Sequence, residues 1–581
     1  MSFPNPEEAF ALRGQRQKIV DQNGHMLVVG GPGSGKTTIA LLKARRHVLE
    51  RLDSGQKVLF LSFSNSAIRR IIESAGRILT DEVVGGLEIR TYHSFAWEVL
   101  RSHGYLTSSQ RRLKILPAQD AAIRAAGLGR EEWRGEQYRL YVEEGLVTYE
   151  QFAPRAAEIL QRSRSACGCF CSGYPLIMVD EFQDTDLDQW ALVRILSEMS
   201  EIIALGDTEQ RIYEWRPGVS AQRLQEFADT LECKQFDLGD ENNRSPATGI
   251  AGFARSLLSP GSVQGFPDAI ARHRFRPGQL PLHLHLAVRT ALKEARERSG
   301  KGRPKIAVAA RSKPLVRKIS YALSAEMSTN GRALKAVPHD VRIDQNDILL
   351  AARVIANILS DAEGSRNDRL AKALDRIADV FRAAANKTNI QTSEKLRRWA
   401  AKCRAAEKPN TKCVVALDYV MDIIYQEGLS GSPRDDWVIV RRLLEKSEID
   451  ELRKVAELTL YLRLFRRGSA IEQALIELWA NQGNYRGAEA ALEQALLQQQ
   501  VLDSHRETDI VTVMNMHQLK GREYDAVVLV EDEYRTFMAR DRTPPHPDTR
   551  RLLQVSLTRA REFVLIVSNV GKDTFDQLLG G

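Results

Sequence analysis

Two parts of the sequence alternate short apolar runs with longer stretches of helical periodicity. This alternation is typical of parallel α/β layers, in which a buried strand is followed by a helix that covers it. In the first part the expected strands are His25–Gly30, Val58–Ser62, Leu87–Thr91, Leu176–Val179 and Ile202–Leu205. In the second part they are Lys305–Ala309, Asp509–Met514, Ala526–Val530 and Phe563–Val567. The pattern therefore predicts two α/β cores.

The regions between these strands have a different pattern. Residues 96–171 and 361–504 place apolar residues at i, i+3 and i+4, as in Ile449–Arg466 and Ala488–Leu497. This spacing puts the apolar side chains on one face of a helix. We therefore expect each core to be interrupted by a mainly helical insertion.

One short segment alternates strictly between leucine and histidine. The run 282–286, LHLHL, has the period of two that is typical of a half-buried strand. The pattern predicts a strand whose histidines, His283 and His285, face water. No acid or thiol stands next to them in the sequence, which argues against a metal site.

Length and composition indicate an ordinary protein of several domains. The chain has 581 residues, of which 43% are hydrophobic and 27% charged, and a domain typically has about 150 residues. These values exclude collagen-like, disordered and disulfide-scaffold classes. No apolar run approaches the roughly 18 residues of a membrane helix, and Glu7 and Glu8 replace the basic start of a secretory signal. We expect a cytoplasmic protein.

The six cysteines are too sparse for a disulfide framework. Three of them, Cys167, Cys169 and Cys171, are clustered at i, i+2 spacing, whereas metal knuckles usually show C-x-x-C. Metal binding by this cluster stays open as the minor alternative. The other three are expected to be reduced thiols.

Positive charge is concentrated in one helical region. The whole chain has a formal net charge of +8, and residues 366–412 contain 13 Lys or Arg against five acids. Such a surface could simply be solvated, or it could contact phosphates. Phe381 and Trp399 are the aromatic residues within this region that could stack on bases.

The segment Gly30–Thr37, GGPGSGKT, lies directly between an apolar strand and a predicted helix. Its glycines allow successive backbone N–H groups to point at phosphate oxygens, and the helix N-terminus adds partial positive charge. Lys36 is expected to reach the β- and γ-phosphates, and Thr37 to coordinate Mg²⁺. The predicted nucleotide-binding residues are Gly30, Gly31, Pro32, Gly33, Ser34, Gly35, Lys36, Thr37 and Thr38.

A second candidate feature is the apolar run Leu176–Val179, which ends in the adjacent acids Asp180 and Glu181. At the carboxyl end of a strand near a phosphate-binding loop, Asp180 can hold Mg²⁺ and Glu181 can polarise the attacking water. The two features together predict a nucleoside triphosphatase.

Several further segments make the sequence resemble the UvrD/Rep-type superfamily 1 helicases. The string Val179–Thr185, VDEFQDT, is a highly specific signal of that family. The other matching segments, in family order, are Gln15-Arg16, Ser62–Ala67, Thr91–Phe95, Gly206–Arg216, Asn242–Ser245, Met514–Tyr524 and Arg551–Ala560.

The resemblance implies roles for residues in these segments. Gln15 would read adenine, and Glu523 would contact the ribose. Gln210 would sense the γ-phosphate, while Arg244 and Arg559 would stabilise the transition state as arginine fingers. The residues implied to contact DNA are Phe63, Asn65, His93, Tyr213, Trp215, Arg216 and His517.

The sequence departs from the family at several positions. Thr38, Asn243, Asn515 and Gln554 stand where the family usually has arginine, tyrosine, threonine and tyrosine. Selectivity for adenine would therefore be loosened. Residues 361–504 do not align with the family, although a large rotating subdomain is expected after the fourth motif.

The resemblance also implies an α/β architecture with two RecA-like parallel-sheet motor cores. The implied domains are 1–95, the first part of core 1A; 96–171, a helical insertion 1B; 172–245, the second part of core 1A; 246–360, the first part of core 2A; 361–504, a divergent 2B-like insertion; and 505–581, the second part of core 2A.

The implied activity is ATP- and Mg²⁺-dependent movement along single-stranded DNA in the 3′ to 5′ direction, with displacement of the complementary strand at duplex junctions. One alternative is an ATP-gated DNA-binding subunit that partners a nuclease in repair or anti-phage defence without processive unwinding. Another is an RNA helicase.

Overall fold

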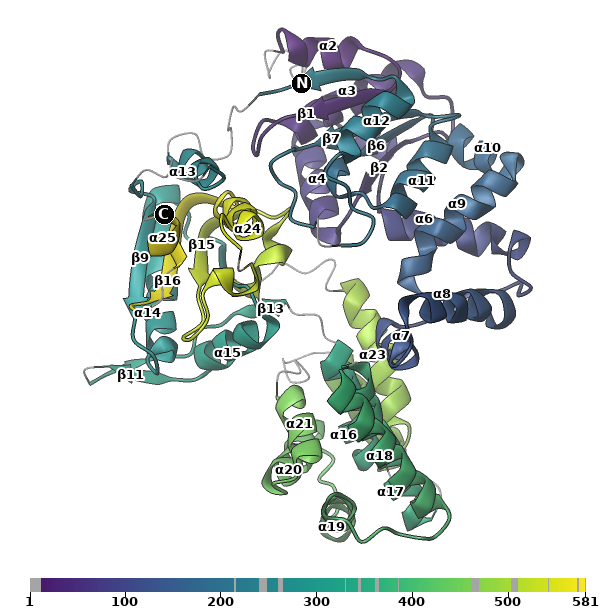
Figure 1. Cartoon of the computed structure of the whole chain (residues 1–581), viewed down its shortest axis with the longest axis vertical. Coiled ribbons are helices and arrows are strands. Elements are labelled where there is room, and N and C mark those ends of the chain that lie inside the picture. Colours follow the sequence, from purple (N-terminus) through teal and green to yellow (C-terminus); the bar gives the residue numbers. More distant parts are fainter. Residues whose placement is uncertain are drawn as a thin grey trace. The chain divides into compact units, whose positions relative to one another are not determined.

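The computed structural model describes residues 12–213, 216–239, 248–259, 265–329, 331–342, 346–360, 365–384, 386–460, 470–502, 510–541, 543–571 and 574–579. The chain forms two compact units (Figure 1). Unit 1 consists of Met1–Leu113, Glu150–Ile343 and Thr508–Gly581, and unit 2 of Lys114–Tyr149 and Asp344–Glu507.

Unit 1 contains a first core built on a parallel sheet of order β3-β2-β6-β7-β1-β8. Its strands are β1 (Met26–Val29), β2 (Val58–Ser62), β3 (Leu87–Thr91), β6 (Leu176–Val179), β7 (Glu201–Gly206) and β8 (Lys234–Asp237). The five predicted strands of this core are confirmed. Strands β2 and β6 are buried throughout, which explains their uninterrupted apolar sequences.

Helices follow the strands of this first core. They are α2 (Gln15–Asp21), α3 (Lys36–Arg51), α4 (Asn65–Ile78), α5 (Asp81–Gly85), α6 (Tyr92–His103), α9 (Phe152–Arg162), α10 (Arg164–Gly173), α11 (Leu187–Leu196) and α12 (Arg223–Leu231). Helix α3 buries Ile39 and Leu42 against the sheet residues Met26 and Val58 in one apolar cluster. This packing fixes the start of α3 beside the carboxyl end of β1.

The second core of unit 1 has a parallel sheet of order β13-β14-β10-β15-β16-β9. Its strands are β9 (Ile270–Phe275), β10 (Ile306–Ala310), β13 (Asp340–Arg342), β14 (Val511–Asn515), β15 (Tyr524–Val530) and β16 (Ala560–Asn569). Its helices are α13 (Ile250–Ser256), α14 (Leu280–Ser299), α15 (Lys313–Ser324), α24 (Pro547–Leu557) and α25 (Thr574–Leu579), with a hairpin of β11 (Met327–Thr329) and β12 (Arg332–Leu334). The four predicted strands are confirmed.

The predicted strand at 282–286 is wrong, because these residues lie in helix α14. The buried positions of α14 continue as Leu284, Ala287, Val288 and Ala291, which is helical spacing over a longer window. The side chain of His285 is buried, and its Nε2 lies 2.9 Å from the carbonyl oxygen of Ala322. The alternation of leucine and histidine was therefore too short to indicate a strand.

Unit 2 is mainly helical and brings the two insertions together. The first insertion supplies β4 (Lys114–Ile115), α7 (Ala118–Ala125), α8 (Arg130–Arg139) and β5 (Leu146–Val147). The second supplies α16 (Asn346–Leu359), α17 (Arg366–Ala383), α18 (Lys387–Arg404), α19 (Lys412–Glu427), α20 (Pro433–Lys446), α21 (Asp450–Thr459), α22 (Ala470–Gln482) and α23 (Ala488–Leu502).

Polar contacts join the insertions within unit 2. Arg353 Nη1 donates to Asp120 Oδ1 over 2.7 Å, and Arg382 Nε donates to the carbonyl oxygen of Ile123 over 3.0 Å. Trp437 and Tyr485 are among the largest fully buried side chains of the second insertion. The α/β class with two RecA-like cores is confirmed, while the six-segment domain division remains a prediction. No helix in the described ranges is both long and apolar enough to cross a membrane.

Candidate nucleotide-binding site

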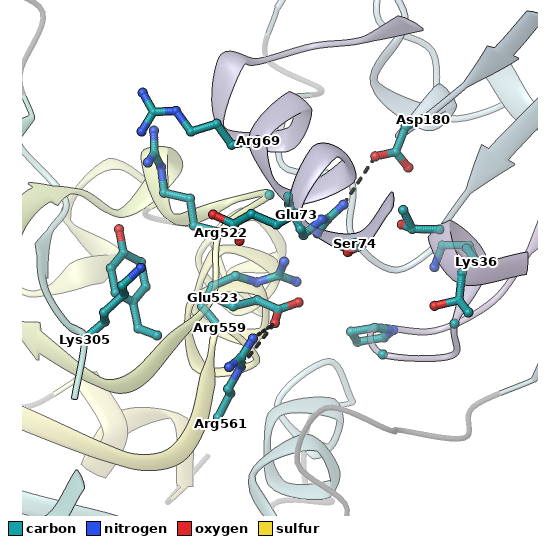
Figure 2. Close-up of a pocket in the computed structure, with 18 of the residues that line it drawn as sticks. Lys36, Arg69, Glu73, Ser74, Asp180, Lys305, Arg522, Glu523, Arg559 and Arg561 are labelled. Carbon is teal, nitrogen blue, oxygen red and sulfur yellow. Dashed lines mark hydrogen bonds and ion pairs between the residues drawn. The ribbon is translucent and has the colours of Figure 1, made fainter. Parts of the chain in front are cut away.

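A cavity of about 890 Å³ is lined by residues from both cores of unit 1 (Figure 2). The first core supplies the loop residues 32–38, the end of β6 and one face of α4. The second core supplies residues around the starts of β10, β15 and β16. Among the predicted site residues, the cavity brings together Pro32, Gly33, Ser34, Gly35, Lys36, Thr37, Thr38, Asp180, Glu181, Gln210, Glu523 and Arg559.

The loop between β1 and α3 has a backbone that requires glycine. Gly33 and Gly35 have φ angles of +85° and +91°, and a Cβ on Gly30 would stand 2.6 Å from Ser34 Oγ. Lys36 Nζ donates to the carbonyl oxygens of Gly30 and Gly31 over 2.6 and 3.0 Å. The loop thus forms a cradle of backbone groups with one ammonium at its centre.

The two predicted acids lie at the end of β6. Asp180 is buried, with 3% of its surface exposed, and Arg70 Nη2 of α4 donates to its Oδ2 over 3.3 Å. Burial raises the pKa of Asp180 against the pull of Arg70. Glu181 has a φ of +56° and accepts from Gln183 Nε2 over 2.7 Å.

The charge state of Glu181 is set mainly by its cationic neighbours. Burial acts to raise its pKa, but Lys520, Arg70 and Lys36 together lower the pKa to about 2. Lys520 Nζ lies 3.6 Å from Glu181 Oε2. The carboxylate is therefore ionised at neutral pH.

Lys520 joins the two cores at this point. It follows the short helix η5 (Met516–Leu519) of the second core, and its buried Nζ pairs with Asp184 and donates to the carbonyl oxygen of Gln210 over 2.5 Å. Asp184 and Glu181 outweigh burial and raise the pKa of Lys520. Burial raises the pKa of Asp184 to about 6, against the attraction of Lys520.

Gln210 forms a second polar connection between the cores. Its Nε2 donates to Asp207 Oδ2 over 2.6 Å, and its Oε1 accepts from Arg559 Nη2 over 2.5 Å. Arg559 is 1% exposed, and its Nε also donates to the carbonyl oxygen of Val555 over 3.0 Å. The side chain that was expected to sense the γ-phosphate thus contacts the expected arginine finger directly.

The remaining predicted nucleotide contacts differ in their placement. Glu523 lines the cavity and accepts from Arg561 Nη2 over 2.8 Å. Gln15 is exposed and does not line the cavity, whereas its neighbour Arg16 donates to the carbonyl oxygen of Ser34 over 3.4 Å. Arg244 lies outside the described residues.

The side chains present fit a magnesium-bound nucleoside triphosphate. Ser34 Oγ is buried in the loop and has no hydrogen-bond partner within the part of the chain that the structure describes. Thr37 and Asp180 offer the hydroxyl and carboxylate oxygens that Mg²⁺ prefers, and both line the cavity. These two residues would hold the metal.

The predicted DNA-contacting residues have varied surroundings. The rings of Phe63 and Tyr92 pack with centroids 5.2 Å apart, and the exposed His93 lies 6.0 Å from Phe152. The Tyr213 hydroxyl of the first core donates to the carbonyl oxygen of His517 in the second core over 3.2 Å. Arg216 is exposed, and its guanidinium lies 5.7 Å from the Tyr213 ring centroid. Trp215 and the side chain of Asn65 lie outside the described residues.

The cysteine cluster has the geometry of ordinary helix packing. Cys167 and Cys171 are buried on one face of α10 with sulfur atoms 3.9 Å apart, while Cys169 is exposed. Burial raises the pKa of both buried thiols. Within the described ranges, no group of three or more His, Cys, Asp or Glu side chains could hold a metal ion.

Much of the positive charge in residues 366–412 is compensated inside unit 2. Arg366 pairs with Asp418, Arg397 with Asp379, and Arg376 with Glu489 over 2.8, 2.7 and 2.5 Å. The local excess of positive charge is therefore smaller than the number of Lys and Arg residues in this region suggests. The pairs support the solvated-surface interpretation over phosphate contact.

Sequence reasoning missed Lys520, Arg70 and Asp184. Lys520 is separated from Asp184 by 336 residues, so no local pattern connects them. Arg70 could have been noticed, because it stands on the first turns of the helix that follows β2, at the same sheet edge as Asp180.

The fold and the cavity define a protein with two RecA-like cores and a glycine-rich loop at a cavity that residues of both cores line. Residues 15–216 match a family model described as an AAA domain. DNA helicase II of Salmonella typhimurium is 24% identical over 626 residues, covering 94% of this chain and 83% of that protein. DNA helicase II of Escherichia coli K12 is 23% identical with the same coverage.

A second group of relatives agrees with the first. The ATP-dependent DNA helicase PcrA of Staphylococcus aureus strain Mu50 is 21% identical over 636 residues, which cover 97% of this chain and 83% of that protein. The chain is thus homologous to DNA helicase II and PcrA over most of its length, and the resemblance to the UvrD/Rep-type superfamily 1 helicases is confirmed.

Proposed function

We propose that this protein is an ATP-dependent DNA helicase that couples hydrolysis of Mg-ATP to 3′ to 5′ movement along single-stranded DNA and to strand separation. The observation that carries the proposal is the cavity whose wall combines Lys36, Asp180 and Glu181 from one core with Arg559 and Glu523 from the other. Its homology to proteins named as DNA helicases supports DNA as the polymer.

In this proposal each core contributes to a step of hydrolysis. The loop and Lys36 would bind the phosphates, and ionised Glu181 would orient the attacking water and accept its proton. Bound Mg²⁺ would neutralise charge on the phosphates. Arg559 would stabilise charge that develops in the transition state, so turnover would require both cores at one nucleotide.

The contacts of Gln210 and Lys520 support coupling between the nucleotide and the DNA track. Gln210 touches Arg559, and Lys520 touches the carbonyl oxygen of Gln210 while its ammonium lies 5.6 Å from the Tyr213 ring centroid. Loss of the γ-phosphate would thus shift Gln210 and Lys520, and this movement would reach Tyr213 through the contacts between these side chains.

The test of the proposal is ATPase turnover of the full chain with and without single-stranded DNA, followed by displacement of a labelled strand from a tailed duplex. Strong stimulation by DNA and release of the strand only from substrates with a 3′ tail would support it. ATP hydrolysis with little strand release would instead support the ATP-gated partner subunit. Stronger stimulation by RNA would contradict DNA as the polymer.

Arg559→Ala is expected to lower kcat for ATP hydrolysis by about 10³-fold with a much smaller change in ATP affinity. An arginine finger acts mainly on charge that develops in the transition state. Arg561→Ala is the matched control, because Arg561 lines the same cavity but pairs with Glu523. Steady-state kinetics would measure both variants. A change confined to KM in Arg559→Ala would contradict the assignment.

Trp215→Ala is expected to weaken single-strand binding by about 1–3 kcal/mol and to leave basal ATPase nearly intact, because a stacked base loses its aromatic partner. Fluorescence anisotropy with a labelled oligonucleotide and ATPase assays without DNA would measure both quantities. Tyr213→Phe keeps a ring two residues away and serves as the comparison. A lower melting temperature with unchanged DNA affinity would show that Trp215 is a packing residue.

A further inference from the structure

The side chains that line the cavity carry more positive charge than a bound nucleotide would neutralise. Eleven Lys or Arg residues line the cavity against five Asp or Glu residues. Four of these acids are already paired: Asp180 with Arg70, Glu181 with Lys520, Glu523 with Arg561 and Asp525 with Lys301. A triphosphate whose charge is partly cancelled by Mg²⁺ would offset only part of the surplus.

The excess charge is concentrated away from the phosphate-binding loop. In Figure 2, Arg69, Arg522 and Lys305 lie on one side of Glu523, while Lys36 and Asp180 lie on the other. Arg342, at the end of β13, lines the same cavity. We call Arg69, Arg342 and Arg522 the arginine cluster. Its members come from α4, from β13 and from the turn that precedes β15.

The guanidinium groups of the cluster act on one another. Burial, together with the positive charges of Arg342 and Arg69, lowers the pKa of Arg522 to about 10, although Tyr524 acts in the opposite direction. Within the described ranges, no carboxylate lies within ion-pair distance of Arg342 or Arg522. Guanidinium groups buried close together repel one another, and an anion bound among them would relieve this repulsion.

The geometry of Arg522 is suited to binding an anion. Its Nε donates to the carbonyl oxygen of Gln518 over 3.0 Å, which holds the side chain in place. Guanidinium groups bind phosphate through paired, charge-assisted hydrogen bonds. A fixed guanidinium loses less conformational entropy when such bonds form.

We propose that the arginine cluster forms a second anion site in this cavity, which binds a phosphate group beyond the one held by the loop Gly30–Thr38. The anion is either the inorganic phosphate released by hydrolysis or the phosphate of a separate small molecule. The inference rests on the proposed function in one respect, because it takes the nucleotide to be bound at the loop.

The test is calorimetric titration of inorganic phosphate into the full chain saturated with Mg²⁺ and a non-hydrolysable ATP analogue. We expect one phosphate to bind per nucleotide-loaded chain, and Arg342→Gln or Arg522→Gln to weaken this binding about tenfold each. Arg276→Gln is the matched control, because Arg276 is exposed and lies outside the cavity lining. Binding of the analogue to every variant shows that each is folded.

Two outcomes would overturn the proposal: the nucleotide-loaded chain binds no phosphate, or the cluster variants bind it as well as Arg276→Gln does. Failure of the ATP analogue itself to bind would instead contradict the proposed function. A single-turnover assay of phosphate release distinguishes the sources. A changed release rate in Arg522→Gln identifies product phosphate, and an unchanged rate with weakened phosphate binding identifies a separate phosphate-bearing molecule.

Discussion

Replacing Glu181 with Gln is expected to lower kcat for ATP hydrolysis by about 10²–10⁴-fold while nucleotide still binds. The amide keeps the size of the side chain but cannot accept a proton from water. The ionised state of Glu181, held by Lys520, Arg70 and Lys36, is lost in the variant. Steady-state ATPase assays and binding of a fluorescent nucleotide would measure the two effects separately.

Lys36→Ala is the informative partner of this variant. Lys36 supplies the charge at the centre of the loop, where its Nζ contacts the carbonyl oxygens of Gly30 and Gly31. We expect its removal to abolish turnover through loss of nucleotide binding. If both variants lost nucleotide binding equally, the separate roles assigned to Lys36 and Glu181 would be wrong.

Lys520→Met is expected to have the largest effect on stability. The substitution leaves Asp184 buried without its partner, and breaking a buried pair in this way costs about 3–5 kcal/mol. It also removes the contact with the carbonyl oxygen of Gln210 that connects the cores. Thermal unfolding of the full chain would show a lower melting temperature, and ATPase activity would fall with it because the cores are less firmly closed.

Two further variants make this prediction specific. Lys293→Met removes a lysine whose side chain is 72% exposed and which pairs with Glu297, itself 60% exposed, so its cost should be about 0–1 kcal/mol. Adding Asp184→Asn to Lys520→Met should restore part of the lost stability, because the uncompensated carboxylate is gone. Equal losses for Lys293→Met and Lys520→Met would show that Lys520 is no more than a surface partner.

The interior strands of both sheets could be predicted from sequence, whereas three of the four edge strands could not; the edge strand β3 is the exception. Buried parallel strands such as Val58–Ser62 and Leu176–Val179 are apolar throughout and stand out from their surroundings. The strands β8, β9 and β13 lie at sheet edges. Their sequences, KQFD, IARHRF and DVR, are interrupted by charged or polar residues. Hydrophobic pattern carries little information where one side of a strand faces solvent.

The residues of the candidate site also divide into those that the sequence predicts and those that it does not. Residues 32–37 and the acids Asp180 and Glu181, which a local pattern singles out, line one cavity, while their roles remain predictions. Lys520 and Arg70 contact these acids from other elements, and that proximity depends on how the sheets and helices pack. A single sequence contains no direct record of such contacts.

Each unit is built from segments that lie far apart in the sequence, and this affects how the protein folds during synthesis on the ribosome. Strand β10 cannot have its sheet neighbours β14 and β15 before residues 511–530 have been made. Helix α7 likewise cannot pack against α16 and α17 of its unit until these helices, which lie more than 200 residues later in the chain, have been made. Neither unit can therefore finish folding while the nascent chain is short, and exposed apolar surface would persist during much of translation. We expect chains cut before residue 511 to depend on chaperones and to aggregate when these are depleted.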